Sequence, residues 1–309
     1  MLSMLTATAK YSILWNKLKE GQESMLSQEE ITFYHENGYL TVENVLSAAE
    51  LDALQRVTDE FVERSRSISE HNDIFDLEPD HSHDNPRLRR IKEPVSHHDV
   101  YDRTLRHDGI LDIVEQLIGK GVRYNGNKLN MKAGGHGTAV EWHQDWAFYP
   151  HTNDDLLAVG VAIDAMTEEN GCMLMVPGSH KTDLISHHEN GVFVGAVADP
   201  DYQPQRVEKC LVGAGGISLH HVRTLHASAP NHSAHPRRLL LFQYCSIDSW
   251  PLLGSPSFDA YLSTVLRGQP VKRPRMDALP VIIPEPKPEN AGSIFEIQEA
   301  LQEREMAKQ

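Results

Sequence analysis

From Gly121 to about Asp248 the chain consists of short apolar or alternating segments separated by turn residues at close intervals. This spacing is typical of the strands of a β-sandwich or β-barrel. Leu156 to Ile163 is apolar throughout, as expected for a strand that is buried on both faces. Lys128 to Lys132 instead alternates polar and apolar residues, which predicts a strand with one face toward a cavity. The remaining predicted strands are Tyr39–Val45, Cys172–Val176, Glu208–Val212, Gly216–His220 and Leu239–Ile247.

Helical patterns precede these strands and predict helices that brace a sheet from outside. Ser27 opens a capping box, and Gly38 provides the stop signal of that helix. Ser47 can cap a second helix that continues to about Arg66. A third helix is predicted from Arg103 to Ile118. The expected fold class is therefore mainly β with flanking α-helices.

The length of 309 residues fits one domain with additions at its ends. We expect this domain over residues 27–250, after a frayed N-terminal extension over residues 1–26. The tail, residues 251–309, is rich in proline. It should run extended over the surface before a last short helix near residues 294–305.

The formal net charge of −15 argues against a nucleic-acid partner, because binding a phosphate backbone needs a concentrated basic surface. No apolar run approaches the ~18 residues that cross a bilayer, so no membrane partner is expected. One local basic cluster is interpreted as part of a solvated, turn-rich loop between Ser69 and Pro94, with the binding of an anionic ligand as the alternative. Its members are Arg87, Arg89, Arg90 and Lys92.

Three cysteines, Cys172, Cys210 and Cys245, form a sparse and odd-numbered set within predicted strands. Buried free thiols in a reducing compartment are expected rather than disulfides. The sequence thus predicts a cytoplasmic protein.

The pattern His-X-Asp occurs three times, beginning at His71, His97 and His143. The first two lie in or beside the turn-rich stretch, where a solvated loop is the expected structure. His143 instead closes a run of alternating residues, so it should be held at the end of a rigid strand. We therefore select His143 and Asp145 as candidate metal ligands.

A third candidate ligand, His226, lies 81 residues after Asp145. Two imidazoles and one carboxylate suit one face of an octahedral Fe(II), which leaves positions for an organic co-substrate and O2. A catalytic zinc site uses the same ligand types, so zinc stays an alternative at this point. Arg237, eleven positions after His226, favours iron, because its fork can grip the distal carboxylate of a 2-oxo acid.

In combination, these motifs resemble the phytanoyl-CoA dioxygenase family. The resemblance rests on Trp142 to Trp146, Glu169 to Cys172, Pro177 to His180, and His226 to Ser228 with Asn231, Ser233 and Arg237. It covers about Ser27 to Asp248. It implies a double-stranded β-helix, or jelly roll, that uses Fe(II), 2-oxoglutarate and O2 to hydroxylate or otherwise oxidise a small molecule, with release of succinate and CO2.

Residue by residue, the resemblance implies His143, Asp145 and His226 as iron ligands and Arg237 as the anchor of the 2-oxoglutarate C5 carboxylate. Ser228, Asn130 and Tyr149 match further co-substrate contacts. Arg238, directly after Arg237, is the alternative anchor. Candidate substrate residues are Lys92, Met131, Trp146 and Phe148, for which barrel core or a solvated side chain is the alternative. The strand-embedded His220 and His221 are expected to pack rather than to bind metal.

The sequence departs from parts of the family. The run after His-X-Asp in ectoine hydroxylases is replaced by Trp146-Ala147-Phe148, so ectoine is a poor expectation as substrate. Asp145 stands where halogenating relatives have Gly or Ala, which favours hydroxylation. A small to medium polar or amphipathic metabolite is expected. Two other classes stay open, a zinc-dependent hydrolase and a non-catalytic jelly-roll binding protein, and the sequence predicts no oligomeric state.

Overall fold

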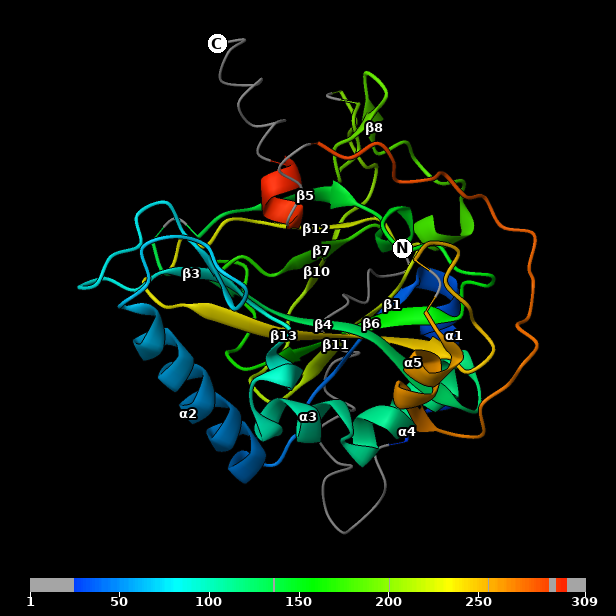
Figure 1. The fold of residues 1–309 in the computed structure, drawn as a ribbon, viewed down its shortest axis with the longest axis horizontal. Helices are drawn as coiled ribbons and strands as arrows, with labels where there is room; N and C mark the ends of the chain where they lie inside the picture. Colours follow the sequence, from blue (N-terminus) through cyan, green and yellow to red (C-terminus); the bar gives the residue numbers. More distant parts are fainter. Residues whose placement is uncertain (1–24, 136, 200, 255, 289–292, 299–309) are drawn as a thin grey trace, which may run out of the picture.

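The computed structural model describes residues 25–298, except 136, 200, 255 and 289–292. A large and a small antiparallel sheet face each other, and helices cover the outer side of the large sheet (Figure 1). Of the predicted extension over residues 1–26, only Met25 and Leu26 are described. Leu26 is buried, and its backbone N–H donates to Gln116 Oε1.

The large sheet has the order β1-β11-β6-β13-β4-β3-β2, and β14 also pairs with β4. Its longest strands, β4 and β13, pair with each other along their whole length. Its strands are β1 (Tyr39–Val42), β2 (Phe75–Leu77), β3 (Leu88–Lys92), β4 (Val122–Lys132), β6 (Leu156–Ala162), β11 (Ile217–His221), β13 (Arg237–Ser246) and β14 (Val265–Arg267).

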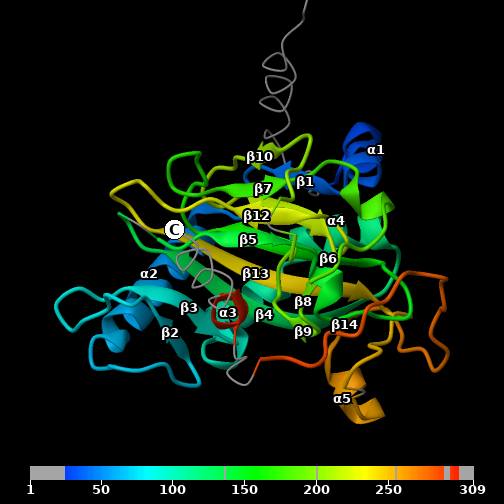
Figure 2. The ribbon, with the colours of Figure 1, turned by 90° about the horizontal axis from the view of Figure 1, so that it is seen from above.

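The small sheet has the order β10-β7-β12-β5 and lies over the large sheet (Figure 2). A separate hairpin, β8 with β9, stands beside it. These shorter strands are β5 (Val140–His143), β7 (Met173–Met175), β8 (His188–Glu189), β9 (Val192–Phe193), β10 (Glu208–Cys210) and β12 (His226–Ser228). Two facing antiparallel sheets formed in this way are a jelly roll, so the predicted fold class is confirmed.

The helices begin at the caps that the sequence predicts. Ser27 and Ser47 each form a capping box. The prediction of one helix over residues 103–118 is wrong, because two separate helices cover this segment. His107 accepts a hydrogen bond from the N–H of Ile110 and thereby caps a new helix. The helices are α1 (Gln28–Asn37), α2 (Ala48–Ser65), α3 (Asp99–Leu105), α4 (Asp108–Ile118) and α5 (Phe258–Ser263).

The main hydrophobic core lies between these helices and the outer face of the large sheet. Phe61 of α2 and Val114 of α4 pack in one cluster with Leu129 of β4 and Leu240 of β13. Because side chains alternate along a strand, the neighbouring residues of β4 and β13 point to the inner face. That inner face carries the polar residues of β4, including Lys128, Asn130 and Lys132.

The stretch Ser69–Pro94 is not only a loop, since it contains β2 and β3. The basic residues of this stretch form ion pairs and are not only solvated. Arg89 pairs with Glu78, and both side chains are largely buried. Arg90 and Lys92 pair with Asp76. Ion pairs between neighbouring strands therefore make this charged sequence part of the sheet.

The tail after residue 250 departs from the predicted extended course. It forms α5, and β14 joins the large sheet beside β4. A short helix over residues 294–298 lies near β5, within the predicted span 294–305.

The prediction for the cysteines is confirmed, since all three are buried and free. Within the described residues no helix is both long and apolar enough to cross a membrane.

Candidate active site

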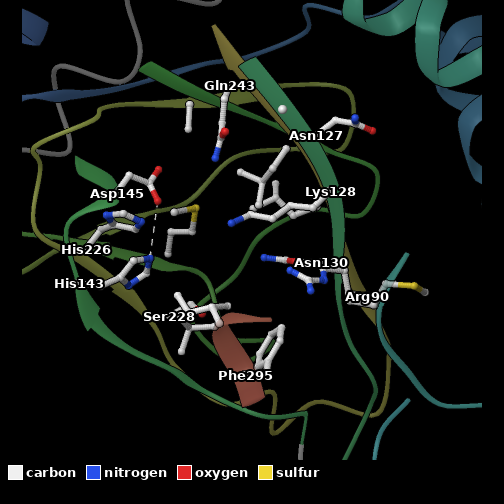
Figure 3. A pocket seen from close by; sticks show the side chains of 18 of the residues that line it. Arg90, Asn127, Lys128, Asn130, His143, Asp145, His226, Ser228, Gln243 and Phe295 are labelled. Carbon is white, nitrogen blue, oxygen red and sulfur yellow. Dashed lines mark ion pairs between the residues drawn. The ribbon is translucent and has the colours of Figure 1, made fainter. Parts of the chain in front are cut away.

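A cavity of about 520 Å³ lies between the two sheets (Figure 3). Its lining comes from the inner face of the large sheet, from β5 and β12 of the small sheet, and from Ile294 and Phe295 of the tail. The polar faces of β4 and β13 are therefore turned toward this cavity. The alternation seen at Lys128 to Lys132 correctly predicted a strand with a cavity face.

His143, Asp145 and His226 meet at one wall of the cavity, and their ligand atoms all lie within 4.8 Å of one another. His143 ends β5 and His226 begins β12, and the two residues are directly opposite in the strand pairing. Asp145 follows in a short 3-10 turn over Asp145–Ala147. The pairing of β5 with β12 thus brings together side chains that are far apart in the sequence.

Both imidazoles are oriented by the backbone. His143 Nδ1 lies 2.8 Å from the carbonyl of Glu141, and His226 Nδ1 lies 2.9 Å from the carbonyl of Thr224. A carbonyl can only accept, so each Nδ1 carries the proton and each Nε2 keeps a lone pair for a metal. Burial lowers the pKa of His143 to about 4 and that of His226 well below its usual value, so both rings are neutral at neutral pH. The donor set fits a divalent metal ion.

Asp145 supplies the anionic ligand atom. Burial alone would raise its pKa, but the close contact with His220 and the charges near it hold the pKa well below its usual range. His220 Nε2 lies 3.4 Å from Asp145 Oδ2. The carboxylate is therefore ionised, and the ring of His220 in β11 lies beside it.

Arg237 and Ser228 lie on opposite sheets and both line the cavity. Arg237 Nη2 donates to the carbonyl of Gly171 at 2.9 Å, while its Nε is buried without a partner among the described residues. Burial lowers the pKa of the Arg237 guanidinium to about 10, which leaves it charged. Arg238 points to the opposite side of β13 and pairs with Asp164 and Asp59. Of these two adjacent arginines, Arg237 is the one whose guanidinium faces the cavity.

Asn130 also lines the cavity, and its buried Oδ1 has no partner among the described residues. Tyr149 is placed differently. It does not line the cavity but packs beside the cluster of Trp146 and Leu156. Burial raises the pKa of Tyr149 well above its usual value, and the nearby Asp145 carboxylate raises it further. Tyr149 therefore lies next to Asp145, and its contact with the co-substrate stays a prediction.

The four candidate substrate residues separate into two pairs. Lys92 and Met131 are part of the cavity lining, although Met131 also belongs to the main core. Trp146 lies outside the lining, because its ring is fully buried and its Nε1 donates to the carbonyl of Pro280. Phe148 also lies outside the lining, because its ring packs edge-on against His143 and Phe193.

Several lining residues were not predicted. Lys128 and Gln243 come from the inner faces of β4 and β13, and Ile294 and Phe295 come from the tail. The signal for Lys128 was present in the alternation with Leu129. The tail residues had no such signal, because a contact between the tail and the sheets has no local pattern in the sequence.

Buried histidines predict a marked acid sensitivity of the metal-free protein. Burial lowers the pKa values of His143, His151 and His187 each to about 4. In the unfolded chain these groups take up protons near pH 6.5, so protons favour unfolding between pH 6.5 and 4. We expect the free energy of unfolding to fall by roughly 2 kcal/mol per histidine between pH 6.5 and 5.

Urea unfolding of the metal-free protein at pH 7 and pH 5 measures this loss. The His151→Gln variant should show a smaller difference between the two pH values, by the contribution of one histidine. Equal unfolding free energies of the wild type at both pH values would contradict the prediction.

Known proteins similar to this chain agree with the geometry. A family model described as phytanoyl-CoA dioxygenase matches residues 34–239. A "Probable alpha-ketoglutarate-dependent hypophosphite dioxygenase" from Stutzerimonas stutzeri is 36% identical over 277 residues, which are 88% of this chain and 96% of that protein. A methylphosphonate hydroxylase from Gimesia maris is 26% identical over 71% of this chain and 80% of its own length. The crystal structure of EctD from S. alaskensis with bound Fe has a TM-score of 0.63 and 21% identity, and covers 84% of this chain and 90% of that one.

Proposed function

Since the chain belongs to the phytanoyl-CoA dioxygenase family, we propose that its cavity oxidises a small phosphorus oxyanion, with hypophosphite as the first candidate. The chain is an Fe(II)- and 2-oxoglutarate-dependent dioxygenase. This function is supported by one observation above all. The unprotonated Nε2 atoms of two histidines and one carboxylate lie close together at a cavity that is also lined by Arg237. The relatives named for hypophosphite and methylphosphonate support the substrate class.

We assign the cofactor contacts as follows. His143, Asp145 and His226 would hold Fe(II). Arg237 would bind the distal carboxylate of 2-oxoglutarate, and the Ser228 hydroxyl would donate a further hydrogen bond to it. Asn130 has the burial and the unpartnered amide expected of another contact to the co-substrate. When bound, the iron and 2-oxoglutarate together supply the activation of O2, with succinate and CO2 as products.

The protein itself orients the metal ligands and shields the cavity from water. The backbone carbonyls at Glu141 and Thr224 fix the two imidazoles, so no proton has to leave before the metal binds. Ile294 and Phe295 form part of the lining on the tail side, where apolar side chains limit the access of water. Charged groups in such a space interact more strongly than they do in bulk water.

The proposed reaction balances as the insertion of one oxygen atom. One atom of O2 converts a P–H bond of hypophosphite into P–OH, which gives phosphite. The other atom enters the carboxylate of succinate as 2-oxoglutarate loses CO2. The three free buried thiols support a reducing compartment such as the cytoplasm for this reaction.

The test is an assay of the anaerobically iron-loaded protein with 2-oxoglutarate and hypophosphite, started by addition of air. We expect phosphite, followed by phosphorus NMR, in a one-to-one ratio to succinate. Zinc-loaded protein should form neither product. If 2-oxoglutarate is consumed but methylphosphonate stimulates succinate formation and hypophosphite does not, the substrate assignment is wrong. Turnover without any need for 2-oxoglutarate would instead favour a hydrolase.

A further inference from the structure

The side chain of Lys128 enters the cavity from the centre of β4 and points toward the wall that carries the three ligands (Figure 3). Within the part of the chain that the structure describes, its ammonium group has no hydrogen bond and no ion pair. The charged groups that act on it most strongly are Asp145 and Arg90. An ammonium that faces a cavity without a protein partner is available to bind an anionic ligand.

Three other basic residues of the cavity are already paired. Arg90 and Lys92 both bind the carboxylate of Asp76. Lys132 Nζ donates to backbone carbonyls, including those of Thr138 and Ser228. Lys128, Lys132 and Arg237 have no acidic partner within ion-pair distance among the described residues, but the ammonium of Lys132 is already hydrogen-bonded to backbone carbonyls. Lys128 and Arg237 are therefore the cations whose side chains have donors left for a ligand in the cavity.

The backbone positions of Lys128 and Arg237 lie well apart along the sheet. Arg237 stands opposite Lys132, whereas Leu241 stands opposite Lys128. Four residues of β13 separate these positions, which corresponds to about 13 Å along the strand. If Arg237 takes the distal carboxylate of 2-oxoglutarate and the metal takes the other end, Lys128 is left for a second anion.

The charges of the metal, its ligand Asp145 and the co-substrate with its anchor point to the same conclusion. A divalent metal, ionised Asp145, charged Arg237 and doubly negative 2-oxoglutarate together carry no net charge. The ammonium of Lys128 then adds a positive charge that none of these groups neutralises. A monoanion, such as hypophosphite at neutral pH, would neutralise it.

Gln243 lines the cavity from the same sheet as Lys128. It lies on β13 opposite Gly126 of β4. Its Oε1 accepts from Asn125 Nδ2 at 3.5 Å, and the described residues offer no acceptor to its Nε2. A Cβ atom at Gly126 would come within 2.8 Å of Gln243 Oε1, so glycine is needed for the amide to lie in this place.

We propose that Lys128 and Gln243 form an oxyanion subsite that binds the negatively charged oxygen atoms of the substrate, separate from the co-substrate anchor at Arg237. This inference rests on the proposed function and adds the residues that select an anionic substrate. Burial lowers the pKa of Lys128, while Asp145 opposes this change. A bound anion would favour the charged form of Lys128 in the same way.

The test uses protein loaded with Zn(II) and 2-oxoglutarate, which cannot turn over. Calorimetry measures the binding of hypophosphite to the wild type and to the Lys128→Met variant. We expect the variant to bind hypophosphite about 10- to 100-fold more weakly, the effect of a lost charged hydrogen bond. Its affinity for 2-oxoglutarate should stay within about twofold. Lys120→Met is the matched control, because the Lys120 side chain is 92% exposed, and it should change neither affinity.

A second variant, Gln243→Leu, keeps the charge and should weaken hypophosphite binding by about three- to tenfold, as expected for one lost neutral hydrogen bond. Unchanged binding of hypophosphite to Lys128→Met, or an equal loss of 2-oxoglutarate affinity, would overturn the subsite. So would a wild type that binds neither hypophosphite, phosphite nor methylphosphonate. A wild type that binds hypophosphite through Lys128 but does not oxidise it would support the subsite and remove only the proposed substrate.

Discussion

The Asp145→Ala variant is expected to lose hypophosphite oxidation and 2-oxoglutarate consumption together. Replacement of a group that merely supports a metal ligand typically costs about 10- to 100-fold in metal affinity or activity. Asp145 is a ligand itself in this assignment, and it is the one anionic member of the set. We therefore expect a loss of about 1000-fold or more, beyond that range for supporting groups.

The measurement is succinate release by the variant after anaerobic loading with Fe(II), together with its iron content. Asp183→Ala is the matched control, because Asp183 is an exposed acid in a loop and should have wild-type activity. A thermal melt of the metal-free variant separates loss of metal from loss of the fold. Wild-type succinate release by Asp145→Ala would remove this residue from the ligand set.

The site could be predicted from the sequence where its residues lie within a strand. His143 ends a run of alternating residues, and the same alternation turns Lys128, Asn130 and Lys132 toward the cavity. Arg237 and Arg238 are adjacent, so alternation also decides which of them faces a ligand. A period of two is a local property of the chain, and this is why it could be recognised without a structure.

The positions that the sequence could not predict depend on the tertiary structure. Trp146 and Phe148 lie in and directly after a 3-10 turn, where the alternation of β5 has ended and no longer indicates a direction. β3 was missed because its basic residues look solvated until their acidic partners on and beside β2 are known. Phe295 reaches the cavity from a tail that has no periodic pattern toward it.

The Arg237→Gln variant is expected to raise the half-saturating concentration of 2-oxoglutarate by about 100-fold, with a smaller effect on the rate at saturation. The reason is the loss of a charged fork that can form two hydrogen bonds to a carboxylate, where each such bond contributes about 1.5–3 kcal/mol. Glutamine keeps one amide donor and much of the volume. The change should therefore act on binding more than on folding.

The measurement is succinate release as a function of 2-oxoglutarate concentration, with hypophosphite held at saturation. Arg238→Gln is the matched control, because Arg238 pairs with Asp164 and Asp59 on the other side of β13. That variant should melt at a lower temperature but keep the wild-type requirement for 2-oxoglutarate. The two variants thus separate the cavity face of the strand from its core face. The reverse result, a raised requirement in Arg238→Gln and none in Arg237→Gln, would mean that the guanidinium in the cavity does not bind the co-substrate.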